Sequence, residues 1–132
     1  MTPRSSLRPL DVVIRIAIVG LVLGTAYIHS TLGGLLFTLN ALGYLVAAVA
    51  MIIPLGIAIR FRWFIRLGLI AYAATAIVAW YLMGPRYDMA YLAKGIEIVL
   101  IALLLVEVRA YDGNPLRRIR RAVGPTAPAA RA

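Results

Sequence analysis

The chain has 132 residues, of which 63% are hydrophobic and only 14% charged, and its mean hydropathy is +0.91. Soluble domains carry roughly 45–50% apolar and about 25% charged residues, so the composition argues against a water-soluble domain and indicates an integral membrane protein. With no cysteine and a single histidine, the chain cannot form disulfides, thiolate metal sites or a haem site with two histidines of its own.

Four apolar segments dominate the chain. A helix needs about 20 apolar residues to cross a hydrocarbon core of roughly 30 Å. The segments near that length, after a short N-terminal segment (1–11), are residues 12–29, 33–59, 63–83 and 89–108. Because the connections are short, neighbouring helices must run antiparallel. The sequence therefore predicts an all-α fold with four transmembrane helices in an up-down antiparallel bundle.

The second segment is longer than a membrane crossing requires. Either the helix tilts, or Pro54 kinks it near one end. We expect the connection to the third helix at residues 60–62.

The basic residues indicate the orientation of the bundle. The net charge of +9 does not point to nucleic acid, because the arginines bracket the apolar segments instead of forming one basic face. They gather before the first segment, around the second connection and after the fourth segment, whereas the other two connections carry only Arg86, offset by Asp88. The positive-inside rule then predicts a multi-pass protein of a bacterial cytoplasmic membrane, with both termini in the cytoplasm.

The tail, residues 109–132, divides in two. In PLRRIRRAV, apolar residues at i, i+3 and i+7 leave the remaining face to Arg117, Arg118, Arg120 and Arg121. Such a segment either lies on the cytoplasmic membrane surface and contacts anionic lipid headgroups, or is a solvated basic tail that fixes topology. Both interpretations stay open, and the GPTAPAARA that follows is expected to be disordered.

A layer of polar residues is predicted inside the membrane. At 1.5 Å per helical residue, Lys94 and Glu97 lie about 8 and 12 Å from the outer boundary, and Asn40 and Thr75 lie at similar depths. His29 closes the first segment near the same side. Lys94 and Glu97 are three residues apart, so they can pair on one helix face turned toward the other helices, with Asn40 and Thr75 satisfying their remaining hydrogen-bonding capacity.

Three interpretations of this layer compete. It is a structural clasp that fixes helix rotation, a ligand or proton site, as intramembrane ionisable groups often are, or a docking point for another membrane subunit. A metal site is disfavoured, because one histidine and one carboxylate fall short of the usual ligand number.

Other charged residues and glycines have simpler interpretations. Asp11 and Arg15 are expected to pair with each other at the start of the first helix, and Arg86 and Asp88 to form the third turn, with Asp88 capping the fourth helix. Because few polar residues fall in the inner half, no continuous polar path is predicted. The small-residue pair at Gly20 and Gly24 marks a face that approaches another helix.

Two stretches, IHSTLGGLLFTLNALGYL and GPRYDMAYLAKGIEIVLIALLLVE, resemble segments of small four-helix bacterial membrane proteins that have no assigned activity. In that group IH closes the first helix, LLFTLN opens the second, and a GPR-Y/F-D…K…IE pattern spans the third turn and fourth helix. The resemblance implies a fold and a topology but no substrate. It singles out His29, Asn40, Arg86, Asp88, Lys94 and Glu97.

The sequence carries no catalytic or phosphate-binding motif, so we expect neither an enzyme nor a cofactor. The leading functional prediction is a structural or accessory subunit in the lipid bilayer, packing against a larger membrane complex or against its own copies. One alternative is a small oligomeric transporter or channel-like protein in which Glu97 and Lys94 handle a proton or small solute. Another is a redox-complex subunit whose ligands come from a partner.

Overall fold

A computed structural model describes residues 8–111, 113 and 115–124, and this part of the chain is entirely helical apart from its connections. The helices are α1 (Pro9–Thr31), α2 (Leu35–Ile52), α3 (Gly56–Met83), α4 (Asp88–Tyr111) and a short α5 (Pro115–Val123). The first four are each long and apolar enough to cross a membrane. The all-α prediction is confirmed over the described residues.

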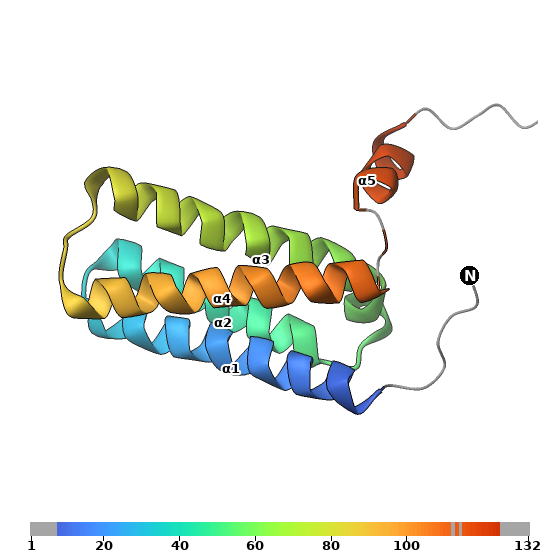
Figure 1. The fold of residues 1–132 in the computed structure, drawn as a ribbon, viewed down its shortest axis with the longest axis horizontal. Coiled ribbons are helices and arrows are strands. Elements are labelled where there is room, and N and C mark those ends of the chain that lie inside the picture. Colours follow the sequence, from blue (N-terminus) through green and yellow to red (C-terminus); the bar gives the residue numbers. More distant parts are fainter. Residues whose placement is uncertain (1–7, 112, 114, 125–132) are drawn as a thin grey trace, which may run out of the picture.

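The four long helices lie side by side (Figure 1). One end of the bundle, here called the terminal end, carries the start of α1, the end of α4 and the α2–α3 connection; the opposite far end carries the α1–α2 and α3–α4 connections. The main contacts run from α1 to α2 and α4, and from α3 to α4 and α2, and of these four pairs α2 and α3 are in the least contact. This loose side of the bundle is where a cavity forms.

Local sequence explains where α1 begins and ends. Pro9 stands in the first turn, where its missing N–H costs no hydrogen bond, and the Arg8 backbone N–H donates to Oδ2 of Asp11 at 3.2 Å. After Thr31 the chain turns through Gly33 and Gly34, whose φ angles of 72° and 87° suit glycine and strain other residues.

Pro54 corrects the predicted extent of the second helix. The expected helix over 33–59 ends at Ile52, and residues 56–59 belong to α3. Ile53 has an extended backbone, with φ −61° and ψ 128°, as expected for a residue before proline. The predicted connection at 60–62 therefore lies inside α3, because the proline ends α2 instead of kinking it.

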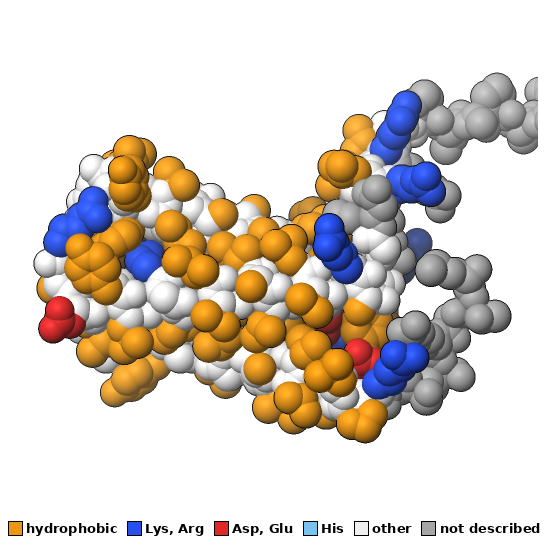
Figure 2. Space-filling view, viewed as in Figure 1, with side chains coloured by type: hydrophobic (Ala, Val, Ile, Leu, Met, Phe, Trp, Pro, Cys, Tyr) orange, Lys and Arg blue, Asp and Glu red, His pale blue; other side chains and the backbone are white. Residues whose placement is uncertain are grey.

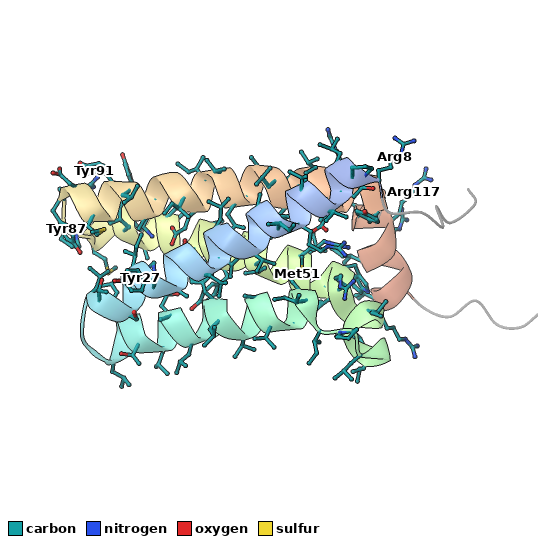
Figure 3. The ribbon with its side chains drawn as sticks, turned by 90° about the horizontal axis from the view of Figure 1, so that it is seen from below. Arg8, Tyr27, Met51, Tyr87, Tyr91 and Arg117 are labelled. Atoms are coloured by element: carbon teal, nitrogen blue, oxygen red, sulfur yellow. The ribbon has the colours of Figure 1, made fainter. Side chains whose placement is uncertain are left out.

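The core is a column of buried apolar side chains between the helices. Its members are Ile18, Val22, Ala26, Tyr44, Ala48, Met51, Leu69, Leu100 and Leu104. Figure 3 shows Met51 pointing into the bundle from α2. The outward side chains are also largely apolar (Figure 2), as a helix bundle in lipid requires.

Charged and aromatic residues mark the two ends. Tyr27, Tyr87 and Tyr91 lie at the far end and Arg8 and Arg117 at the terminal end (Figure 3). Helix α5 stands apart from the four long helices in Figure 1, with Ile119 and Val123 exposed on it. Arg117 and Arg120 are exposed too, whereas the side chains of Arg118 and Arg121 lie outside the described part of the structure. The segment GPTAPAARA, apart from Gly124, also lies outside the described residues.

Candidate functional site

Lys94 and Glu97 form a short ion pair inside the bundle. The Lys94 Nζ lies 2.6 Å from Oε2 of Glu97, across one turn of α4. The Glu97 side chain is fully buried and that of Lys94 is 10% exposed. Both charges therefore face the neighbouring helices, where pairing lowers the cost of removing them from water.

Two residues from other helices complete the surroundings of Glu97. The Tyr44 hydroxyl of α2, fully buried, donates to Glu97 Oε1 at 3.2 Å. The His29 Nε2 of α1 lies 3.9 Å from the same oxygen, and the His29 ring is buried against Phe37 and Tyr44. Residues of α1, α2 and α4 thus meet at one carboxylate.

One hydrogen bond of His29 fixes the role of its Nδ1 atom. Its Nδ1 lies 2.8 Å from the Thr25 carbonyl oxygen, which can only accept. Nδ1 must therefore carry a proton, and Nε2 is either a bare acceptor or, in the charged ring, a donor facing Glu97.

A cavity of about 480 Å³ opens beside this ion pair between α2 and α3. Its walls are mostly apolar and aromatic, with Phe37, Tyr72 and Trp80 among them, and Lys94 and His29 reach it from α4 and α1. At its rim Leu36 and Met83 are 76% and 82% exposed, so the cavity opens on the outer surface of the bundle. Small-molecule sites typically have this size, an apolar lining and a few polar groups.

The predicted polar layer is only partly assembled. Lys94, Glu97 and His29 are brought together, and Asn40 and Thr75 line the adjoining cavity. Neither Asn40 nor Thr75 satisfies the ion pair. The Thr75 hydroxyl donates to the Ala71 carbonyl of its own helix at 2.8 Å, while Tyr44 and the Ala76 carbonyl, 3.4 Å from Lys94 Nζ, take the expected role.

The Asn40 amide has no hydrogen-bond partner among the described residues, although the Asn40 backbone oxygen accepts from the Tyr72 hydroxyl at 3.4 Å. Tyr44 follows Asn40 by one helical turn, so helical spacing from Asn40 would have pointed to Tyr44 as the missing partner.

A second ion network, at the terminal end, was not predicted. Glu107 of α4 is 2% exposed. Its Oε1 accepts from Nε and Nη2 of Arg15 on α1 at 2.9 and 2.8 Å, and its Oε2 accepts from Nε of Arg66 on α3 at 3.0 Å. The predicted Asp11–Arg15 pair is therefore wrong: a carboxylate on α4 presents two oxygens to Arg15 and Arg66, and Asp11 is used at the start of its own helix.

The far-end turn is held by aromatic contacts. Helix α4 begins at Asp88, which places this acidic residue in the first turn, where the helix dipole favours it. The Arg86 guanidinium lies 4.5 Å from the Trp80 ring centre and donates to the Tyr81 carbonyl at 2.8 Å. Through these two contacts Arg86 holds the α3–α4 connection against the end of α3.

No group of three or more potential metal-ligating side chains occurs in the described part of the chain. Comparison of the chain with known protein families, with curated proteins and with solved structures finds no match.

Proposed function

We propose that this chain spans a bacterial cytoplasmic membrane as an up-down bundle with both termini in the cytoplasm, and that it binds a lipid-soluble molecule in the cavity between α2 and α3. The orientation is supported by the arginines at the terminal end. In this orientation the cavity lies in the outer half of the membrane and opens toward the acyl chains, so a ligand would enter from the bilayer.

Unused hydrogen-bond donors in an apolar cavity are the observation that carries this proposal. The Asn40 amide lines the cavity without a partner among the described residues. The Lys94 ammonium has three N–H groups; one contacts Glu97 and another the Ala76 carbonyl at 3.4 Å, which leaves donor capacity at the cavity wall. At this depth no bulk water satisfies such groups, so a ligand with acceptor oxygens would stabilise them.

The charges indicate the kind of ligand. Lys94 and Glu97 already neutralise each other, so an anionic ligand would add a charge without a partner, at a high cost in a low-dielectric site. A neutral molecule with carbonyl oxygens matches the donors of Asn40 and Lys94, and its apolar part matches the aromatic wall. Lipid esters, lipid amides and membrane quinones belong to this class.

Native mass spectrometry of the protein released directly from its source membrane tests the proposal. Wild-type protein should retain a small neutral molecule with carbonyl groups. Ala79→Phe, which places an aromatic ring in the cavity, should abolish this retention, whereas Val78→Phe, on the adjacent residue that is 57% exposed and does not line the cavity, should keep it. Equal retention by both variants, or none by wild type, would refute the proposal.

Asn40→Leu adds a test of the polar anchor. Because the Asn40 side chain makes no hydrogen bond within the described protein, replacing it should leave the fold intact. Ligand affinity should fall about tenfold, the effect of losing one good hydrogen bond to a ligand.

This geometry disfavours one of the other predicted functions and is compatible with the remaining two. A transport path through the bundle is disfavoured, because Leu100 and Leu104, both fully buried, separate the Glu97 and Glu107 networks. An accessory role in a larger complex is compatible with ligand binding and stays a prediction. So does a redox-complex role, for which a quinone would be the fitting ligand.

A further inference from the structure

Among the described residues packed between the helices at the terminal end, positive charges outnumber negative ones. Arg15 and Arg66 share the two oxygens of Glu107, and their guanidinium carbons lie 5.5 and 5.4 Å from the Tyr111 ring centre. A single carboxylate thus serves two guanidinium groups. Arg62 lies one helical turn before Arg66, on the same face of α3, and adds a third positive charge.

Arg62 is poorly satisfied within the described chain. Its Nε is buried with no hydrogen-bond partner there. Its Nη2 donates only to the Ile53 carbonyl, at 3.4 Å, in the connection that Pro54 forces into an extended shape. A guanidinium prefers two parallel hydrogen bonds to a carboxylate or phosphate, whereas among the described residues Glu107 accepts from Arg15 and Arg66 and not from Arg62.

The two carboxylates described at this end do not balance the three arginines. Glu107 and Asp11 together offset two of the three arginines, and Asp11 is already engaged by the Arg8 backbone N–H. Arg60, exposed and two residues before Arg62, adds further positive charge outside the cluster. An anion at this end would therefore find unbalanced positive charge and unused donors in one place.

We infer that Arg62, together with Arg66 and Arg15, forms a binding site for a phosphate group at the terminal end of the bundle, and that the phosphate belongs to an anionic lipid headgroup. The Arg62 fork would bind two phosphate oxygens, while Arg66 and Arg15 stay on Glu107 and contribute their charge. In a membrane-spanning bundle this level lies at the headgroup region, where phosphodiesters are abundant. The site lies at the opposite end from the cavity and does not depend on it.

Lipid-dependent binding tests this site on the full-length protein. Wild type, Arg62→Gln and Arg60→Gln are reconstituted in nanodiscs of phosphatidylcholine with a graded fraction of phosphatidylglycerol, and retained phosphatidylglycerol is counted by native mass spectrometry. Wild type should retain this lipid preferentially. Arg62→Gln should weaken retention about tenfold, as expected when a charge-assisted hydrogen bond is lost, whereas Arg60→Gln, which removes the same charge from an exposed position, should retain it.

The other outcomes of this experiment each support or contradict the phosphate site. If Arg60→Gln weakens retention as much as Arg62→Gln does, the lipid responds to surface charge alone and the inference fails; it fails equally if neither variant has an effect. If inorganic phosphate binds to wild type in nanodiscs of pure phosphatidylcholine but does not bind to Arg62→Gln, the phosphate site stands, and its ligand is a soluble anion and not a lipid. Arg62→Lys, which keeps the charge but loses the fork, should give an intermediate affinity. Ala79→Phe should leave phosphatidylglycerol retention unchanged, which separates this site from the cavity.

Discussion

Glu97 and Glu107 lie on the same helix about 15 Å apart along its axis, and each is the centre of a different ion network. Glu97 joins Lys94 to Tyr44 of α2, with His29 of α1 close by, and Glu107 joins Arg15 of α1 to Arg66 of α3. Helix α4 is therefore the element that holds the other three in register. The apolar core between the two carboxylates keeps the networks separate.

Glu107→Gln should destabilise the bundle strongly. It leaves the buried Arg66 and the partly buried Arg15 without this counter-charge, and breaking such a buried pair costs about 3–5 kcal/mol in soluble proteins. Unfolding by sodium dodecyl sulfate, followed by circular dichroism, measures this cost. Asp88→Asn removes a carboxylate from an exposed position on the same helix and should cost at most about 1 kcal/mol. Similar losses in the two variants would contradict a structural role for the Glu107 network.

Tyr44→Phe isolates one hydrogen bond of the Glu97 network. The ring keeps its packing, and only the hydroxyl that donates to Glu97 Oε1 is lost. Stability should fall by about 1 kcal/mol, the usual net contribution of such a bond. Tyr27→Phe, at a position 71% exposed, is the matched control and should change nothing measurable in the same assay. A stability equal to that of wild type in Tyr44→Phe would show that Glu97 does not need this donor.

Gly43 of α2 leaves room for the Tyr72 side chain of α3. A Cβ atom there would lie 2.8 Å from the Tyr72 hydroxyl oxygen, which itself donates to the Asn40 carbonyl. Gly43→Ala should therefore displace Tyr72 and lower the thermal stability, and Tyr72→Phe in the same chain should restore part of it by removing the crowded oxygen.

Gly20→Ala is the control for this change, because nothing lies within 4 Å of its Cβ position. It should be neutral or stabilising by up to about 1 kcal/mol through the higher helix propensity of alanine. Destabilisation by Gly20→Ala as large as that by Gly43→Ala would mean that both glycines contact other helices in the membrane, for example in an oligomer.

Sequence reasoning found the helices because the apolar segments are long and their connections carry glycine, proline and charge. Hydropathy predicts a second helix that runs past Pro54, because apolar residues continue without interruption to Ile59, whereas α2 ends at Ile52 and Ile53, before the proline, is extended. Apolar content alone does not locate a helix end. The proline locates it, because its ring lacks an N–H and favours an extended backbone at the residue before it.

The same reasoning paired residues that are close in sequence and missed those paired across helices. Lys94 and Glu97 were found because three residues separate them. The sequence predicts that Arg15 pairs with Asp11, four residues before it, whereas its partner Glu107 is 92 residues away. Helix rotation decides which buried carboxylate faces which arginine, and small differences in packing set that rotation. The cavity was not foreseen, since it depends on how loosely α2 and α3 meet.

Tryptophan fluorescence tests the central claim, ligand binding in the cavity, most directly. The chain has two tryptophans, Trp63 and Trp80, near opposite ends of α3, and only Trp80 lines the cavity. In lipid vesicles, Trp63→Phe leaves Trp80 as the reporter and Trp80→Phe leaves Trp63 as the control. A short-chain ubiquinone, a neutral quencher with carbonyl oxygens, should quench Trp80 with a saturable component that weakens about tenfold on Asn40→Leu, and should quench Trp63 only in linear proportion to its concentration. Linear quenching of both tryptophans to the same extent would contradict ligand binding in the cavity.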